Sequence, residues 1–505
     1  MTAIRRRQLT LASASLLACP LLIRHARAAD APLFTLGVAS GQPQPHQLVL
    51  WTRLIGPDLP TDVPVQWELA HDEAFTRIAA QGTEPARAAW AHSVHAEPRN
   101  LEPARWYWYR FTALGQRSRV GRTRTAPAPD AAATLNFAIA SCQRWDHGHY
   151  AAWRHMATEP LDLVMFLGDY IYEYPSPPGV LRAHEGGAVR SLEQYRARYA
   201  QYKSDPALQA AHAACPWLLT WDDHEVENDY AGEHGAGAFT IGFMARRAAA
   251  YQAYWEHQPL SMAARPVGPH LRLHQRLDWG RLARIHTLDN RQYRDAPACL
   301  PWRNAGSSSV ALQDCPALQD PKRSMLGVAQ EQWLAEGWDT QRPWNLLAQQ
   351  TLMARRAWGD ESGEATHNTD GWDGFAPARQ RLLQGAVQRQ LPGLVVLGGD
   401  LHVNYVADLK TDFTDAKSTV IGSEFCGTSI SSRGGSQRRI DAAMAYNPHL
   451  KFGRSDRRGY VGFSLSATEL QARLMAVQRP DDAKSAVDVM AQFVVPLGRP
   501  GAVPA

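Results

Sequence analysis

The sequence lacks an apolar run long enough to cross a membrane. Its most apolar stretch extends from Leu9 to Ile23, fifteen residues that include serine, threonine and proline, whereas a membrane-spanning helix needs about 20 mostly apolar residues. Three arginines at positions 5 to 7 precede the stretch, and Ala26 and Ala28 follow it in an A-x-A arrangement. These features predict an export signal over residues 1–28, cleaved near Ala28, and no stable membrane anchor.

The start of this signal also indicates an export route. The segment "RRQLTL" is similar to a twin-arginine signal, although Leu9 and Thr10 replace the bulkier residues usual after the arginines. We therefore expect the twin-arginine export machinery as a partner, and a periplasmic or secreted location.

An excess of positive charge is missing once the signal is set aside. The whole chain has 53 basic and 49 acidic residues, a formal net charge of +4, and residues 1–28 contain five of the arginines and no acidic residue. Removing those five leaves 48 basic against 49 acidic residues, a net charge of −1. We therefore predict no specific binding of nucleic acid.

Cysteine is scarce, and the number left after cleavage is odd. Cys19 lies in the signal, so five of the six cysteines remain, namely Cys142, Cys215, Cys299, Cys315 and Cys426. Cys299 and Cys315 enclose one loop, "CLPWRNAGSSSVALQDC", and are the natural candidates for a disulfide in an oxidising compartment. At least one remaining thiol must have another role.

Two different patterns divide the rest of the chain, which has no internal repeat. From about Phe34 to Thr125, short runs such as "LVLWTRL" and "WYWYRFTAL" show period-two patterning, which indicates a small β-sandwich over residues 31–125. The Pro- and Ala-rich stretch "TRTAPAPDAAAT" indicates a linker. Apolar strands then alternate with helical patterns such as "FMARRAAAYQAYWEHQ", which predicts an α/β domain over residues 134–495.

Polar side chains follow six apolar strands of this second domain. The strands are "LNFAIAS", "LDLVMFLG", "PWLLTW", "RLARIHTL", "WNLLAQQ" and "LVVLGG", and the polar residues at their ends include Cys142, Asp169, Asp222, Asp223, Asp289, Gln349, Gln350 and Asp400. Open α/β sheets bind ligands beyond the carboxyl ends of their strands, because the loops there converge on one edge. The six loops therefore predict one site.

Several of these loops carry metal-ligand residue types. "GDYIYEY" offers Asp169 and Tyr172, and "GGDLHVNY" offers Asp400 and His402. A phenolate, or a Cys142 thiolate beside a cation, favours a ferric-type transition metal over magnesium or calcium. Each residue has an ordinary alternative, because such an aspartate often only forms a turn and a buried cysteine is often inert.

In order along the chain, "GDYIY", "DDHE" and "GDLH" resemble the strand-end motifs of the calcineurin-like and purple acid phosphatase type of metallophosphoesterase. The sequence departs from that pattern at three positions, since Asp223 replaces an asparagine, Asp400 replaces a histidine and Cys142 replaces an early aspartate. These departures are themselves typical of the PhoD-type alkaline phosphatases, which the chain also resembles in "GVASGQP", "WDDHEVENDYAG", "LDNRQYR", "DGWDG" and "EFCGTSISS".

This resemblance implies a fold and a set of cofactors. The expected fold is an N-terminal β-sandwich followed by a four-layered α/β/β/α metallophosphoesterase domain, and the expected cofactors are one ferric ion (Fe3+) and one or two calcium ions (Ca2+). The residues expected to hold them are Cys142, Asp169, Tyr172 and His402 for iron, with Asp169 bridging, Asp223 and Asp400 for calcium, and Asn228 at the calcium and phosphate end. Oxygen donors at the second site suit calcium.

The resulting hypothesis is an exported phosphoesterase that hydrolyses phosphate mono- and/or diesters by attack of metal-activated hydroxide at phosphorus. His224 is a candidate to protonate the leaving oxygen or to orient phosphate. Arg291 is a candidate to clamp phosphate, although such an arginine often only pairs with a carboxylate. Phospholipase D-like or teichoic-acid phosphodiesterase activity is one alternative, and a catalytically inactive cell-envelope binding protein is another.

Overall fold

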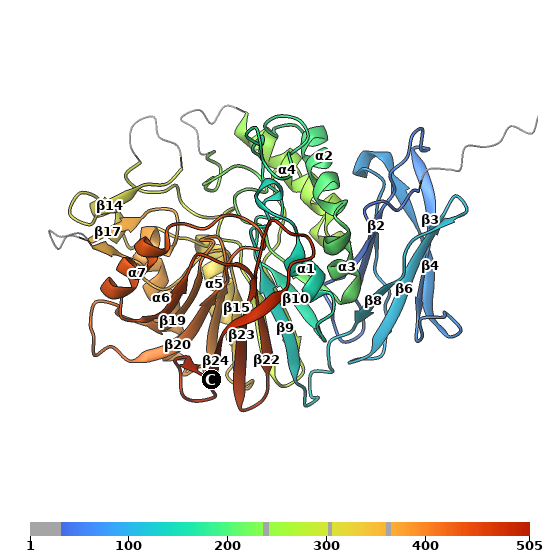
Figure 1. The fold of residues 1–505 in the computed structure, drawn as a ribbon. Coiled ribbons are helices and arrows are strands. Elements are labelled where there is room, and N and C mark those ends of the chain that lie inside the picture. Colours follow the sequence, from blue (N-terminus) through green and yellow to red (C-terminus); the bar gives the residue numbers. More distant parts are fainter. Residues whose placement is uncertain (1–31, 236–241, 301–305, 360–364) are drawn as a thin grey trace, which may run out of the picture.

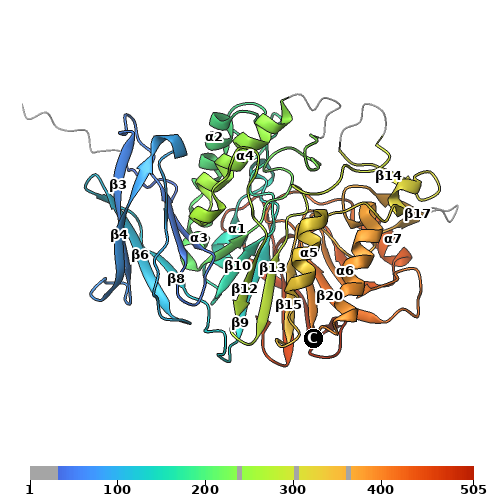
Figure 2. The same ribbon diagram turned by 180° about the vertical axis from the view of Figure 1, so that it is seen from behind.

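The structure is a computed structural model that describes residues 32–235, 242–300, 306–359 and 365–505. A smaller β-rich part and a larger α/β part lie side by side along the molecule (Figures 1 and 2). The predicted export signal at 1–28 lies outside the described residues. Within them, no helix has the length and apolar character that crossing a bilayer requires.

The smaller part is a sandwich of two sheets, as predicted. One sheet contains five strands, which are β3 (Asp62–Ala70), β4 (Ile78–Arg87), β6 (Trp106–Ala113), β7 (Gln116–Arg117) and β8 (Gly121–Arg124). The facing strands are β1 (Val38–Gly41), β2 (Val49–Arg53) and β5 (Ser93–Ala96). Alternate residues of β3 and β6 point inward and form an apolar core that includes Val65, Leu50 and Phe111.

The sandwich shares a sheet with the larger part, which the linker did not lead us to expect. β1 pairs in parallel with β11 (Trp217–Leu219) at Gly41 and Trp217, so β1, β2 and β5 extend a ten-stranded sheet. A Cβ atom at Gly41 would lie 2.4 Å from the carbonyl oxygen of Pro259, which explains the glycine at this junction. The domain limits 31–125 and 134–495 stay predictions.

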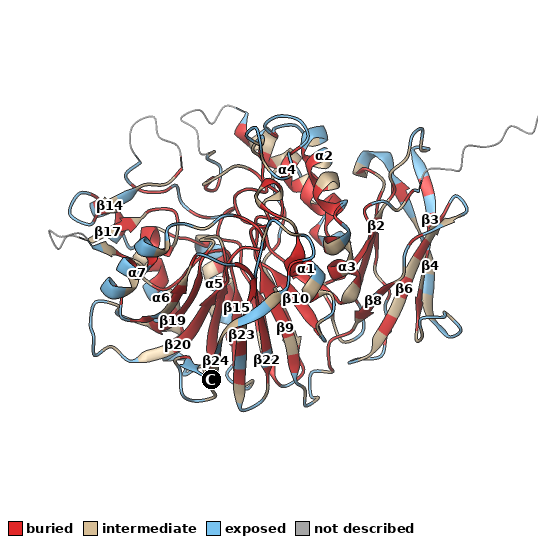
Figure 3. Ribbon diagram, in the orientation of Figure 1, coloured by how far each residue is buried: buried red, intermediate tan, exposed pale blue. Residues whose placement is uncertain are grey.

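The larger part contains two sheets packed face to face. The ten-stranded sheet adds β9 (Leu135–Ala140), β10 (Leu163–Phe166), β22 (Arg458–Leu465), β23 (Glu469–Val477), β24 (Val487–Pro496) and β25 (Val503–Pro504). The other sheet has seven strands, which are β12 (Gln275–Trp279), β13 (Ala283–Thr287), β15 (Trp344–Ala348), β18 (Leu394–Gly398), β19 (Asn404–Lys410), β20 (Val420–Cys426) and β21 (Leu450–Arg454). Apolar side chains such as Phe137, Leu346 and Phe463 fill the space between them, and strands such as β9, β15 and β19 are mostly buried (Figure 3).

Helices cover the outer face of each sheet. Over the ten-stranded sheet lie α1 (Ala151–Met156), α2 (Leu192–Lys203), α3 (Pro206–Ala214) and α4 (Phe243–His257). Over the seven-stranded sheet lie α5 (Gly327–Gly337), α6 (Ala376–Gln388) and α7 (Gln437–Tyr446). The predicted four-layered α/β/β/α arrangement is therefore confirmed.

Short elements complete the described chain. A three-stranded sheet comprises β14 (Ser309–Ala311), β16 (Trp358–Gly359) and β17 (Ala365–Asn368). The 3-10 helices are η1 (Ala88–Trp90), η2 (Trp145–His147), η3 (Met262–Ala264), η4 (Pro316–Gln319) and η5 (Trp372–Phe375). Cys299 and Cys315 form the predicted disulfide, while Cys142, Cys215 and Cys426 are free and buried.

All six predicted strands are present, but they do not belong to one sheet. β9, β10 and β11 run parallel in the ten-stranded sheet, and β13, β15 and β18 run parallel in the seven-stranded sheet. Hydrogen bonds from Gln350 Nε2 to the Trp221 carbonyl (2.7 Å) and from Thr220 Oγ1 to the Leu288 carbonyl (2.8 Å) join their carboxyl ends. The expectation of a single sheet edge is therefore wrong, and the loops meet across the two sheets.

Candidate functional site

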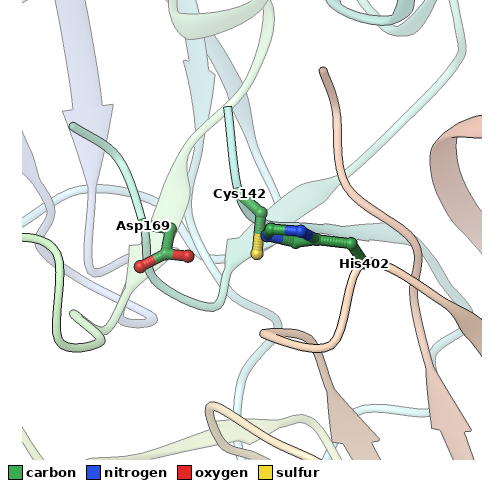
Figure 4. Close-up of side chains that lie close together, drawn as sticks. All are labelled: Cys142, Asp169 and His402. Carbon is green, nitrogen blue, oxygen red and sulfur yellow. The ribbon is translucent and has the colours of Figure 1, made fainter. Parts of the chain in front are cut away.

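Three side chains from separate segments meet where the strand-end loops converge. Cys142 follows β9, Asp169 follows β10, and His402 precedes β19 (Figure 4). One potential ligand atom from each of the three lies within 4.8 Å of the others. The site therefore brings a thiol, a carboxylate and an imidazole together, as the sequence predicted.

Tyr172 completes this group. Its phenol oxygen lies 2.8 Å from Asp169 Oδ2 and 3.2 Å from His402 Nε2, and its side chain is buried. His402 Nδ1 contacts the Arg433 carbonyl at 2.8 Å, so Nδ1 carries the hydrogen and Nε2 presents its lone pair to the group. Four different types of potential metal ligand therefore lie close together.

The backbone is strained at three of these positions and at Asp400, two residues before His402. The φ angles are 59° at Cys142, 60° at Asp169, 62° at Asp400 and 56° at His402, all in the left-handed region that disfavours residues other than glycine. Such conformations cost about 1–3 kcal/mol each and cluster at functional sites. The fold therefore holds these side chains in place against a local conformational preference.

A second group shares Asp169 with the first. One potential ligand atom each from Asp169, Asp223 and His224 lies within 4.8 Å of the others. Asp169 Oδ1 and Asp223 Oδ1 are buried without a hydrogen-bond partner among the described residues. Because unpaired carboxylate oxygens are costly to bury, both atoms are suited to face a cation.

Glu173 holds His224 and the following turn. His224 Nδ1 lies 2.7 Å from Glu173 Oε2, and the backbone N–H of Asn228 donates to Glu173 Oε1 at 2.9 Å. Burial opposes the imidazolium charge, but Glu173, Asp169 and Asp223 raise the pKa of His224 well above its usual value. The side chain of Asn228 is partly buried, and its predicted contact with calcium or phosphate stays a prediction.

Arg291 is buried beneath the site and pairs with carboxylates. Its Nε donates to Asp222 Oδ1, its Nη1 donates to Asp370 Oδ1 at 2.9 Å, and its Nη2 lies 3.6 Å from Asp223 Oδ2. Burial opposes its charge, but these three carboxylates raise its pKa well above the ordinary arginine value. The carboxylate-pairing alternative is thus what the geometry shows, and the phosphate clamp stays a prediction.

Asp400 borders both groups without belonging to either. Burial raises its pKa to about 6, and its charge contributes to the raised pKa values of Cys142 and Asp222. It also lines a small pocket of about 30 Å³ together with Thr351 and Arg356. Its predicted place beside a second ion is compatible with this position.

In the protein alone, burial and neighbouring charges oppose the ionisation of several side chains at the site. Burial raises the pKa values of the Cys142 thiol, the Asp169 carboxyl and the Tyr172 phenol well above their usual ranges. Neighbouring carboxylates reinforce each shift, Asp169 acting on the thiol and the phenol, and Asp223 acting on Asp169. A bound cation would lower these pKa values, because it stabilises thiolate, carboxylate and phenolate at close range.

Several residues that build the site have partners that the sequence did not reveal. Glu225 accepts hydrogen bonds from the backbone N–H groups of Asp169, Tyr170 and Asp222. Asp370, in the "DGWDG" motif, joins Arg291 to the rest of the network, and Ser432, in "EFCGTSISS", contacts the Tyr172 oxygen at 2.8 Å. The motifs were visible, but their sequence separations of up to 260 residues hid their partners.

Comparisons with known proteins agree with this architecture. The sequence model of the PhoD-like phosphatase family matches residues 137–474, and the model of the N-terminal domain of PhoD-like phosphatases matches residues 20–127. Alkaline phosphatase D of Bacillus subtilis (strain 168) is 43% identical over 478 residues, covering 91% of this chain and 80% of that protein.

Solved structures show the same relationship. A structure of PhoD is 41% identical, with a TM-score of 0.89 over 94% of this chain and 92% of that chain. Purple acid phosphatase PPD1 from yellow lupin (Lupinus luteus) seeds is 12% identical, with a TM-score of 0.54 over 92% of this chain and 74% of that chain, and shares the fold alone. Since the family model spans more than half of the sequence and the Bacillus relative is 43% identical, the chain belongs to the PhoD-like phosphatase family and is a phosphoesterase.

Proposed function

We propose that this phosphoesterase depends on one ferric ion and one or two calcium ions, and that it hydrolyses phosphate mono- and/or diesters outside the cytoplasm. The observation that carries the proposal is the sharing of Asp169 by two adjacent groups of ligand-type side chains. A carboxylate in that position suits two neighbouring cations, which together can stabilise the charge that develops during phosphoryl transfer.

The donor types of the two groups fit different metals. Cys142, Tyr172 and His402 would hold iron with Asp169, because thiolate, phenolate and imidazole suit a transition metal. Asp223 and Asp400 would hold calcium, which prefers oxygen donors. The unpartnered buried oxygens Asp169 Oδ1 and Asp223 Oδ1 support this assignment, because a cation would satisfy both.

When bound, such ions lower the pKa of water and neutralise charge on the phosphoryl oxygens. The chain's own residues set the geometry around them. Glu173 fixes the ring of His224 through Nδ1, which leaves Nε2 free to protonate a leaving oxygen or to orient phosphate. Arg291 anchors Asp222 and Asp370, so the carboxylates below the site keep one arrangement.

We also propose that the protein is exported by the twin-arginine machinery. The twin-arginine-like signal supports export of the folded protein through the twin-arginine machinery, to the periplasm or the medium. The relative named alkaline phosphatase D supports phosphate esters as the substrate class. The ratio of the rates on a phosphate monoester and a phosphate diester distinguishes the two preferences.

The experiment measures hydrolysis of p-nitrophenyl phosphate and bis(p-nitrophenyl) phosphate by the purified protein before and after calcium chelation, with Cys142→Ala alongside. The proposal predicts loss of both rates on chelation, recovery on calcium addition, and loss of rate in the variant. A protein that kept its full rate without calcium would contradict the calcium assignment, and a Cys142→Ala variant with full rate would contradict the iron assignment.

A further inference from the structure

Ser432 lies against the ligand-type tyrosine from a segment distant in sequence. It belongs to the serine loop, which we define as residues 427–435, after β20. Its hydroxyl oxygen lies 2.8 Å from the Tyr172 oxygen and 2.8 Å from the Cys142 carbonyl, and it accepts the backbone N–H of Arg144 at 3.1 Å. The side chain is fully buried.

Among the side chains that the structure describes, one neighbour of the Tyr172 oxygen can donate a hydrogen bond to a phenolate there. The three side-chain atoms within hydrogen-bond distance belong to Asp169, His402 and Ser432. An ionised carboxylate only accepts, and His402 Nε2 only accepts because the hydrogen is on Nδ1. The hydroxyl of Ser432 is the remaining donor.

The Cys142 carbonyl competes for the hydrogen of the Ser432 hydroxyl, but this carbonyl already accepts other hydrogen bonds. The Cys142 carbonyl accepts the backbone N–H groups of Ser431 at 3.4 Å and of Ser432 at 3.2 Å. The single hydrogen of the Ser432 hydroxyl therefore stabilises the Tyr172 oxygen more, because no other described side chain within hydrogen-bond distance donates to that oxygen.

The serine loop is held firmly enough to fix this contact. Arg458 is buried and donates to the carbonyl of Ser432, to the hydroxyl of Ser429 at 2.6 Å and to the carbonyl of His402 at 3.4 Å. The same guanidinium thus ties the loop to the segment that carries His402. Arg458 therefore helps to hold Ser432 in place relative to His402.

We propose that Ser432 is a positioning residue that donates a hydrogen bond to the Tyr172 phenolate and thereby sets how strongly this ligand donates electrons to iron. This inference rests on the proposed iron site. A hydrogen bond withdraws electron density from the phenolate oxygen, so its removal makes the phenolate a stronger donor. The consequence is a change in the electronic spectrum of the centre as well as in its activity.

The test records the visible phenolate-to-iron absorption band of iron-loaded wild type, Ser432→Ala and Ser432→Thr. Ser431→Ala is the matched control, because Ser431 is a buried serine of the same loop whose hydroxyl bonds the Arg144 carbonyl at 2.8 Å. We expect the band of Ser432→Ala at longer wavelength, and the bands of Ser432→Thr and Ser431→Ala at the wild-type position. Ser432→Ala also removes a contact that orients the Tyr172 side chain, so we expect iron affinity to fall about 10- to 100-fold in this variant alone.

The outcomes separate the two proposals. A wild-type protein that binds iron and shows the band, with no shift and no loss of iron affinity in Ser432→Ala, overturns the role of Ser432 only. An equal shift in Ser431→Ala also overturns it, because the effect would then follow any loss of packing in the loop. A wild-type protein without iron or without the band overturns the iron site, and the inference about Ser432 with it.

Discussion

Replacement of Glu225, in the turn that follows β11, should lower the free energy of unfolding although Glu225 is not an expected ligand. Its carboxylate accepts the backbone N–H of Tyr170 on Oε1 at 2.6 Å, and those of Asp169 and Asp222 on Oε2 at 3.1 Å and 2.9 Å. It is fully buried and joins the loops after β10 and β11. It therefore fixes two predicted ligand segments relative to each other.

The change Glu225→Gln keeps the size of the side chain and one acceptor oxygen. Placed at Oε2, that oxygen retains the two bonds to Asp169 and Asp222, but the amide NH2 then faces the N–H of Tyr170. A buried donor left without an acceptor costs about 1–3 kcal/mol. We expect urea unfolding followed by tryptophan fluorescence to show a loss of that size in the free energy of unfolding.

Glu227→Gln is the matched control, in the same turn and two residues later. Glu227 pairs with Arg246 at 2.7 Å, and its side chain is 27% exposed, so its loss should cost less than about 1 kcal/mol. Equal losses in the two variants, or a neutral Glu225→Gln, would refute the reasoning that backbone N–H groups at the site depend on this carboxylate.

Three further predictions concern stability. Burial lowers the pKa of His95 to about 3, below its unfolded value of 6.5. The free energy of unfolding should therefore fall as the pH drops below 6.5, by about 2 kcal/mol from this group at pH 5. Identical pH profiles of urea unfolding for wild type and His95→Phe would contradict this. Asp370→Asn should cost about 3–5 kcal/mol in urea unfolding, because it weakens the pairing of two buried arginines, and a neutral effect would contradict the network. Replacing Cys299 and Cys315 together by serine should cost about 3 kcal/mol under oxidising conditions, because the disulfide closes a separation of 16 residues, and unchanged unfolding would contradict its contribution.

The sequence predicted the elements and residues whose signals are local. The six apolar strands were visible as short runs, and polar residues after them marked the loops at which Cys142, Asp169 and His402 meet. The period-two patterning of the sandwich was equally local. Resemblance to known phosphatase motifs then supplied the four-layered order that the strands alone could not specify.

The missing parts depend on contacts between distant segments. The division of the six strands between two sheets depends on pairing partners, which short apolar runs do not encode. The continuity of the sandwich with the ten-stranded sheet depends on one close contact at Gly41. Similarly, the sequence could not identify the carboxylate partners of Arg291, because all three lie on other loops.

The most direct test of the proposed metal centre is elemental analysis of the purified protein, because a centre built on a shared Asp169 should contain iron and calcium together. Cys142→Ala should lose the iron, and Cys215→Ala is the matched control, since Cys215 is also a free buried thiol and lies outside both ligand groups. We expect iron with calcium in wild type and in Cys215→Ala, and no iron in Cys142→Ala. Full iron content in Cys142→Ala, or a fully active wild type that contains neither metal, would contradict it.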